Sequence, residues 1–132
     1  MVGIVIVSHS ARVAEGVCEL AREVAPAATL IVAAGGMQDG SIGTDAVRIA
    51  DAIGAADDGE GIAILADLGS AIMSAEMAIE LLDGAVVARI ADAPLVEGAV
   101  AAAVEAGCGS SLAEVVRAAE EARDARKLGW ED

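Results

Sequence analysis

The stretch MVGIVIVSHSARVAEGVCELAREV, residues 1–24, decides the fold. Its near-continuous β-branched run from Val2 to Val7 predicts a strand buried on both faces, as in a parallel sheet. Apolar residues then recur at helical spacing, with charged residues on the other side, and Pro26 ends the helix that this spacing predicts. The apolar side of that helix would carry Val13, Val17, Leu20 and Val24.

The rest of the chain repeats this alternation between glycine-rich turns. Further strands are predicted at 29–34, 61–66 and 85–90. Of four further helices, one begins at Thr44 or Asp45 and one begins near Ser70. The other two span 94–106 and 111–126. The first of these helices would present Val47, Ala50 and Ile53 as its apolar face, and the second contains Met73, Met77 and Leu81. Strands alternating with helices predict an α/β three-layer sandwich with a mostly parallel central sheet. We expect one domain, residues 1–132.

Composition and charge exclude several classes of protein. The net charge of −14, from 22 acidic and 8 basic residues, argues against a nucleic-acid partner, which needs a basic footprint. No apolar run is long enough to suggest a membrane span, and the N-terminus lacks the basic leader of a signal peptide. Cys18 and Cys108 form no CxxC pair, so each is interpreted as a small, buried, hydrophobic side chain. We therefore expect a reduced cytoplasmic protein without a membrane association.

The spread of acidic residues along the chain also has a physical interpretation. Acidic side chains on exposed faces suit a salt-rich cytoplasm, where screening weakens their mutual repulsion. This favours a halophilic source, with an acidic, lysine-poor protein of an ordinary cell as the alternative.

Three loops follow predicted strands and carry polar residues. In parallel sheets functional residues gather at the carboxyl ends of the strands, where such loops emerge. The rule selects residues 8–10, 35–43 and 67–70, and all three loops should open at the same edge of the sheet.

The chain's only histidine, His9, lies directly after the first predicted strand and before a helix. It could be a surface or capping histidine. However, a helix N-terminus offers free N–H groups and partial positive charge to an anion, and Ser8 and Ser10 add hydroxyl donors. A neutral imidazole keeps a lone pair on one ring nitrogen, which can attack phosphorus. The sequence therefore predicts that His9 is a phosphorylated nucleophile.

Asp67, at the end of the third predicted strand, is the candidate partner of this histidine. The first and third strands are expected to be neighbours in a doubly wound sheet. A carboxylate there could accept a hydrogen bond from the second ring nitrogen, fix the tautomer, and stabilise the charge that develops during attack. The alternative is that Asp67 caps the helix that begins near Ser70, and the two roles are compatible.

The glycine-rich loop 35–44, GGMQDGSIGT, belongs to no common nucleotide motif. It lacks the GK[ST] ending of a Walker A loop and does not match GxGxxG after the first strand. It is either a flexible connection or a wall of the His9 pocket, where glycine lets backbone approach a phosphate or a partner. With one histidine there is no zinc spacing, and there is no GxSxG elbow. Asp57 and Asp58 are interpreted as a solvated turn, and no metal site is expected.

Four segments taken together carry a family resemblance. They are IVIVSHSARVAEGV (4–17), AAGGMQDGSIGTDAVRIADAI (33–53), GIAILADLGSAIMSAE (61–76) and ADAPLVEGAVAAAVEAG (91–107). This combination resembles the DhaM family, the phosphocarrier subunits of phosphoenolpyruvate-dependent dihydroxyacetone kinase. The family is similar to the EIIA domain of mannose-type sugar phosphotransferase systems. The resemblance extends from residue 2 to about residue 120.

The resemblance implies a phosphotransferase subunit of glycerol metabolism with a phosphohistidine intermediate. Such proteins receive phosphate from phospho-HPr at Nε2 of the histidine that matches His9, and pass it to ADP on the DhaL subunit, where Mg is also expected. DhaK holds the dihydroxyacetone, and no cofactor is implied on this chain. An aspartate placed like Asp67 contacts the histidine in related domains. The matching motifs that border the site contain Gly35, Gly36, Gly43, Thr44, Gly69 and Ser70.

The resemblance also implies partners and leaves alternatives. Mannose-type EIIA domains form homodimers with an added antiparallel strand exchanged between subunits. Because the chain ends at Asp132, separate HPr and Enzyme I proteins would be needed. One alternative is a mannose-type EIIA domain that feeds a sugar permease, although PLVEGA and the ending Gly129-Trp130 favour DhaM. The other is a regulatory module that is phosphorylated on His9 without turnover.

Overall fold

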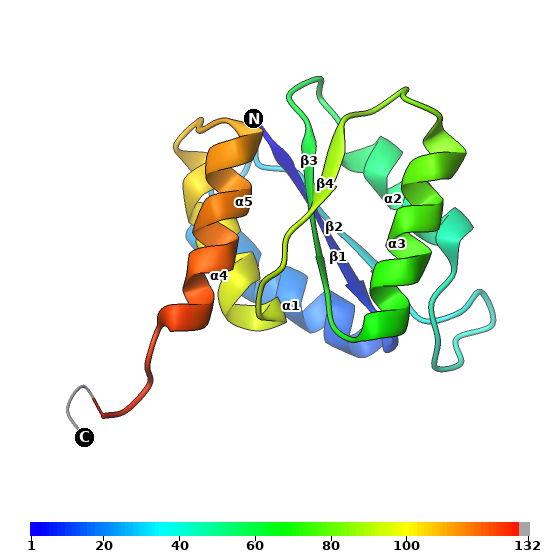
Figure 1. The fold of residues 1–132 in the computed structure, drawn as a ribbon, viewed down its shortest axis with the longest axis horizontal. Helices are drawn as coiled ribbons and strands as arrows, with labels where there is room; N and C mark the ends of the chain where they lie inside the picture. Colours follow the sequence, from blue (N-terminus) through cyan, green and yellow to red (C-terminus); the bar gives the residue numbers. More distant parts are fainter. Residues whose placement is uncertain (130–132) are drawn as a thin grey trace.

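The computed structural model describes residues 1–129, so the expectation drawn from Trp130 lies outside the described part of the chain. The fold is an α/β sandwich of four strands and five α-helices within those residues (Figure 1). In chain order the elements are β1 (Gly3–Ser8), α1 (Ala11–Val24), β2 (Ile31–Gly35), α2 (Ala46–Ala56), β3 (Ile62–Ala66), α3 (Gly69–Leu82), β4 (Ala88–Ile90), α4 (Leu95–Gly107), α5 (Leu112–Glu121) and a 3-10 turn (Ala122–Asp124).

The sheet has the order β2-β1-β3-β4, and every pair of neighbours is parallel. The expectation that the first and third strands are neighbours is confirmed, with Val7 opposite Ala66. Ser8 lies opposite Gly35 on the other side of β1. The carboxyl ends of β1, β2 and β3 therefore meet at one edge.

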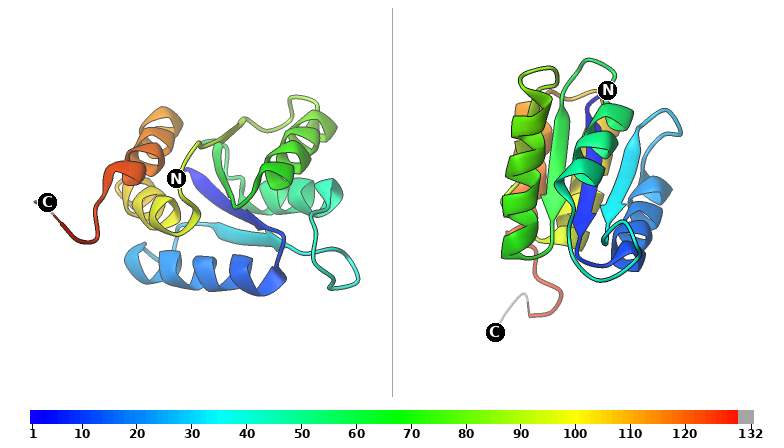
Figure 2. Two further views of the ribbon diagram at one scale, coloured as in Figure 1. Left: turned by 60° about the horizontal axis from the view of Figure 1, so that its bottom comes forward. Right: turned by 90° about the vertical axis from the view of Figure 1, so that its right-hand side faces the viewer.

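Helices cover both faces of the sheet (Figures 1 and 2). The layer of α1, α4 and α5 packs against Ile4 and Ile6 of β1, and the layer of α2 and α3 packs against Val5 and Val7. All six residues of β1 are buried, as the β-branched run predicts. Alternate residues of one strand thus belong to two separate cores.

Alanine occupies most of the buried helix positions, which corrects the apolar faces expected from sequence. In α1 the buried residues are Ala14, Val17, Cys18 and Ala21, whereas Val13, Leu20 and Val24 are exposed. In α2 they are Ile49, Ala52, Ile53 and Ala56, with Ala50 half-buried and Val47 exposed. In α3 they are Ala71, Ala75 and Ala78, whereas Met73, Met77 and Leu81 are exposed. Small side chains face the core because the helices lie close to the sheet.

Several element boundaries also differ from the expectation. A turn closed by the bond from Thr29 N to Pro26 O delays β2 until Ile31, and a turn at Asp83 and Gly84, both with positive φ, delays β4 until Ala88. The regular part of α5 ends at Glu121. Within residues 1–129 no helix combines the length and hydrophobicity needed to cross a membrane.

The two cysteines have different surroundings. Cys18 is buried, and its burial raises the pKa of the thiol to about 11, although Arg22 opposes this change. Cys108 is exposed. The buried-hydrophobe interpretation therefore holds for Cys18 and is wrong for Cys108.

Candidate functional site

Backbone hydrogen bonds join the predicted loops at the carboxyl edge of the sheet. Gly36 N donates to Ser8 O at 3.1 Å, and Gly43 N donates to His9 O at 2.9 Å. The third loop reaches the same residues through the side chain of Asp67. The prediction that these loops open at one edge is therefore confirmed.

The Asp67 carboxylate organises this edge by accepting four hydrogen bonds. Its Oδ2 accepts from Ser8 Oγ at 2.7 Å and from His9 N at 3.0 Å. Its Oδ1 lies 2.9 Å from His9 Nδ1 and accepts from Leu68 N at 2.7 Å. The carboxylate therefore fixes the His9 backbone and imidazole together, and both side chains are about one-fifth exposed.

These contacts determine which protonation states occur at the site. Partial burial raises the pKa of Asp67, but the hydrogen bonds donated by Ser8, His9 and Leu68 outweigh it and bring the pKa below its ordinary value. The group is thus a carboxylate at neutral pH, and a carboxylate can only accept hydrogen bonds. When the His9 ring is neutral, Nδ1 therefore carries its one proton and Nε2 keeps the lone pair.

Ser70, in the first turn of α3, makes the contact to Nε2. Its Oγ lies 2.5 Å from Nε2, so the hydroxyl is the donor when the nitrogen has a lone pair. The N-cap position of α3 is Leu68, which makes no side-chain cap, so the expectation that Asp67 caps this helix is wrong. Among residues 1–129, the N–H groups of Gly69 and Ser70 have no hydrogen-bond acceptor. An uncapped, partially positive helix end therefore lies beside Nε2.

The two serines that flank His9 have different surroundings. Ser8 is fully buried, and its hydroxyl donates to Asp67 while accepting from Ser10 N at 3.0 Å. Ser10 is the N-cap of α1, and its Oγ accepts from Val13 N at 3.2 Å. Ser8 thus holds Asp67 in place, whereas the Ser10 hydroxyl hydrogen remains available at the edge of the site.

Glycine is required at Gly35 because α1 crosses close to the end of β2. A Cβ at this position would lie 2.7 Å from Ser10 O and 2.9 Å from Ala11 Cα, which is closer than real Cβ contacts. At Gly43 the φ of 146° is strained for other residues, and a Cβ would meet the Met37 side chain. The loop is therefore a structured wall beside His9.

The Thr44 hydroxyl forms its hydrogen bond with α3 and not with His9. Its Oγ1 lies 2.7 Å from Ser74 Oγ, one helical turn beyond Ser70 on α3. Sequence reasoning did not single out Ser74, although its i+4 spacing from Ser70 was a usable signal. This bond attaches the glycine-rich loop to the helix that carries Ser70.

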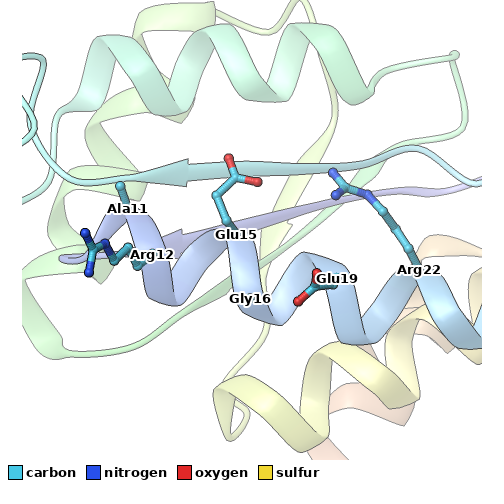
Figure 3. Close-up of a pocket in the computed structure, with 6 residues that line it drawn as sticks. All are labelled: Ala11, Arg12, Glu15, Gly16, Glu19 and Arg22. Atoms are coloured by element: carbon cyan, nitrogen blue, oxygen red, sulfur yellow. The ribbon is translucent and has the colours of Figure 1, made fainter.

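Other features of the described residues lie apart from His9. A surface hollow of about 450 Å³ follows the outer side of α1, lined by Ala11, Arg12, Glu15, Gly16, Glu19 and Arg22, and it contains neither His9 nor Asp67 (Figure 3). Residues 1–129 contain no group of three or more His, Cys, Asp or Glu side chains placed to hold a metal ion.

Fold and site together define an α/β domain with one surface histidine oriented by an aspartate. The EIIA-man family model, described as PTS system fructose IIA component, matches residues 3–116. The chain is 48% identical over 107 residues to "PEP-dependent dihydroxyacetone kinase 2, phosphoryl donor subunit DhaM" of Listeria innocua, and this match covers 80% of the chain and 86% of the relative. The chain therefore belongs to the DhaM proteins of the EIIA-man family.

One further relative agrees with this membership, and one solved structure has a similar fold. The DhaM protein of Klebsiella michiganensis is 44% identical over 133 residues, which is 97% of the chain but only 28% of that protein. The chain thus spans little more than a quarter of this relative. A solved structure of an unknown function protein, EF1359, matches with a TM-score of 0.80 at 36% identity and covers 98% of the chain and 99% of its own length.

Proposed function

We propose that the chain is a phosphohistidine carrier that accepts a phosphoryl group on Nε2 of His9. The observation that carries this proposal is the pairing of Nδ1 with Asp67, which leaves a lone pair on Nε2 at the rim of the site. The names of the relatives, as phosphoryl donor subunits of dihydroxyacetone kinase, support the same role. The donor would be phospho-HPr and the acceptor ADP held on DhaL, with DhaK binding dihydroxyacetone in the same pathway.

The proposed transfer needs no group on this chain beyond its own residues. Nε2 attacks phosphorus as the phosphorus–nitrogen bond of phospho-HPr breaks, and the positive charge that develops on the imidazole is balanced by Asp67. The Ser70 hydroxyl turns from Nε2 to a phosphoryl oxygen, and the free N–H groups of Gly69 and Ser70 face the others. In the second step ADP attacks the same phosphorus, so ATP forms on DhaL and Nε2 recovers its lone pair. Mg would accompany ADP on DhaL.

The first experiment measures phosphate uptake by intact mass. The chain is incubated with phosphoenolpyruvate, Enzyme I and HPr, and we expect a gain of one phosphate that is lost on mild acid treatment. His9→Ala should show no gain. A phosphate that persists on His9→Ala, or the absence of any gain on the unaltered chain, would contradict the carrier role.

The second experiment tests the acceptor. The phosphorylated chain is purified away from Enzyme I and mixed with DhaL loaded with ADP, and ATP is then measured on DhaL. We expect stoichiometric transfer. Phosphate that stays on His9 would support a regulatory module in place of a kinase subunit.

We also propose that the carrier is a homodimer joined through α3 and the free edge of β4. Met73, Met77 and Leu81 form an apolar stripe on α3, with exposed fractions of 69%, 56% and 56%, and Val87 beside β4 is 67% exposed. The outward N–H and C=O groups of Ala88 and Ile90 have no partner among residues 1–129, and such an edge can add another strand. Sedimentation should show a dimer that Met77→Glu converts to a monomer. An unaltered monomeric mass would contradict this assembly.

The acidity supports a further proposal about the protein's surroundings. With a net charge of −14, we infer a reduced, salt-rich cytoplasm in which screening offsets self-repulsion. The melting temperature should rise steadily between low salt and molar KCl. A melting temperature that does not change with KCl would contradict salt adaptation.

A further inference from the structure

Ser8, the last residue of β1, has a hydroxyl whose hydrogen bonds are both set by its neighbours. The side chain is fully buried. Its Oγ accepts from Ser10 N at 3.0 Å and donates to Asp67 Oδ2 at 2.7 Å. The direction of both bonds follows from chemistry, because an amide N–H can only donate and a carboxylate can only accept. The hydroxyl hydrogen is therefore committed to Asp67, and a group that arrives at Nε2 of His9 cannot use it.

The orientation of the Asp67 carboxylate depends on its hydrogen bonds. The torsion that rotates a carboxylate is broad and selects no single angle by itself. Oδ1 lies against His9 Nδ1 and Leu68 N, while Oδ2 accepts from His9 N and Ser8 Oγ. The bond from Ser8 is the shorter of the two at Oδ2. Without it, Oδ2 would keep one donor, the backbone N–H of His9 at 3.0 Å.

The same hydroxyl connects Asp67 to the start of α1. Ser10 is the N-cap of this helix, where the N–H groups are positively polarised. Because hydrogen bonds in a chain polarise one another, the bond that Ser8 accepts from Ser10 N strengthens the bond that it donates. A continuous chain of hydrogen bonds therefore runs from Ser10 N through Ser8 and Asp67 to Nδ1 of His9.

The hydroxyl also helps to keep Asp67 ionised. Partial burial raises the pKa of Asp67, and the hydrogen bond from Ser8 is foremost among the interactions that lower it. An ionised carboxylate accepts the proton of Nδ1 and balances the positive charge that develops on the ring when Nε2 attacks. Ser8 thus acts on Nε2 through Asp67, from the buried side of the imidazole.

We propose that Ser8 is a positioning residue for the transfer: its buried hydroxyl holds the Asp67 carboxylate in the orientation that keeps the proton of the neutral imidazole on Nδ1. This inference rests on the proposed function. It names a residue that controls the reactive nitrogen without contact with the phosphoryl group or with either partner protein.

The first test is the kinetics of Ser8→Ala. The variant should lower kcat for uptake from phospho-HPr about 10-fold, the scale of one hydrogen bond to a charged group. KM should stay unchanged, because a fully buried side chain cannot touch the donor protein. Phosphoramidate, a small chemical donor that needs no docking, should phosphorylate His9 more slowly by the same factor. A normal kcat in the folded variant, or a change confined to KM, would overturn the proposal.

The second test observes the ring directly. His9 is the only histidine in the chain, so its imidazole ¹⁵N signals need no assignment. At a pH where the ring is neutral, the unaltered chain should show the proton on Nδ1, and Ser8→Ala should show a larger fraction with the proton on Nε2. A merely structural role would not change this ratio. Slower uptake with an unchanged ratio would therefore overturn the proposal.

Ser8→Cys separates the hydrogen bond from the space that the side chain fills. A thiol has a similar shape, but its S–H is a weak donor. Uptake by this variant should be nearly as slow as uptake by Ser8→Ala, with the same change in the ¹⁵N ratio. A full rate would show that filling the space is enough, and would overturn the proposal. If Ser8→Ala does not fold, Ser8→Cys supplies both measurements.

Ser110→Ala is the matched control, because Ser110 Oγ also donates to a carboxylate, that of Glu105, at 2.5 Å. Ser110 lies beyond the end of α4, where Gly107 packs against Pro26 at the opposite edge of the sheet from His9. We expect normal uptake and an unchanged ¹⁵N ratio. A loss of kcat equal to that of Ser8→Ala would show that losing any such bond slows uptake, and would overturn the assignment to Ser8.

The outcomes for this inference and for the proposed function are distinguishable. No uptake by the unaltered chain from phospho-HPr or phosphoramidate would contradict the carrier role itself. Uptake that is lost in His9→Ala but normal in Ser8→Ala would leave the carrier role intact and contradict the role of Ser8 alone.

Discussion

Nδ1 of His9 lies 2.9 Å from Oδ1 of Asp67, and the same carboxylate also accepts the His9 backbone N–H. One side chain thus fixes both the ring and the chain segment that carries it. Since Nδ1 must donate, Nε2 is the nitrogen with the lone pair, and it faces the first turn of α3. The chemistry of the site depends on this single pairing.

Replacing Asp67 with Asn should slow phosphate uptake by up to about 10⁴-fold, by analogy with tautomer-fixing aspartates. Asn has one oxygen that accepts and one NH₂ group that only donates. If the NH₂ group takes the place of Oδ2, it faces Ser8 Oγ and His9 N, which are both donors, and these two hydrogen bonds are lost. The substitution also leaves the charge on the phosphorylated ring unbalanced. Quenched uptake from phospho-HPr gives the rate, and circular dichroism checks the fold. An unchanged rate in a folded variant would reduce Asp67 to a structural residue.

The lowered pKa of Asp67 predicts how stability depends on pH. Because the pKa is below its ordinary value in the folded state, the carboxylate contributes stability above the unfolded pKa of about 4. That contribution is lost as pH falls through the folded pKa. Urea unfolding gives the free energy of unfolding of the unaltered chain and of Asp67→Asn from pH 7 down to pH 3. The difference between the two free energies should shrink below about pH 4. A difference that stays constant with pH would mean that ionisation of Asp67 contributes no stability.

The location of the site could be predicted from sequence because it follows from chain direction. His9 and Asp67 each follow a buried strand, and parallel strands place their carboxyl ends together. The donors nearest Nε2, in the first turn of α3, did not follow from chain direction, although the family resemblance placed Gly69 and Ser70 at the border of the site. The sequence indicated the helix after His9, whereas the ring points to α3, because His9 continues the alternation of Val5 and Val7, which face the layer of α2 and α3. Sequence alone does not say which layer covers which face.

Most of the expected apolar helix faces were wrong for a related reason, although Val17 and Ile53 are buried as expected. Larger apolar residues such as Leu20 and Met77 mark a face by hydrophobicity, but burial depends on how closely two backbones approach. Gly35 permits α1 to pass so near β2 that alanine fills the available space. The strands, which depend on local β-branched runs, were recovered with shifts of a few residues at their ends, and the expected neighbours β1 and β3 are adjacent. The full strand order was not predicted.

Ser70→Ala tests whether the Ser70 hydroxyl moves its hydrogen bond from Nε2 of His9 to a phosphoryl oxygen. If the hydroxyl stabilises the transferring group, its loss should slow uptake by about 10-fold, although the resting hydrogen bond to Nε2 is also removed. The rate with phosphoramidate should fall by a similar factor, because this effect does not depend on docking. Faster uptake would show that Ser70 only masks the lone pair. Ser74→Ala, which breaks the bond to Thr44, serves as the neighbouring control.

A pair of glycine substitutions tests whether the close approach of α1 and β2 maintains the site. Gly35→Ala should cost about 1–3 kcal/mol of unfolding free energy, because its Cβ meets Ser10 O and Ala11 Cα, which are backbone atoms that cannot rotate away. Gly16→Ala, in the middle of α1 with open space around it, should instead stabilise the chain by about 1 kcal/mol. Urea unfolding gives both values. Because Gly35→Ala displaces the start of α1, and with it the residues next to His9, we also expect slower phosphate uptake in this variant while Gly16→Ala keeps the normal rate. If both substitutions had the same effect on stability, the contact between Gly35 and α1 would not be the constraint that positions His9.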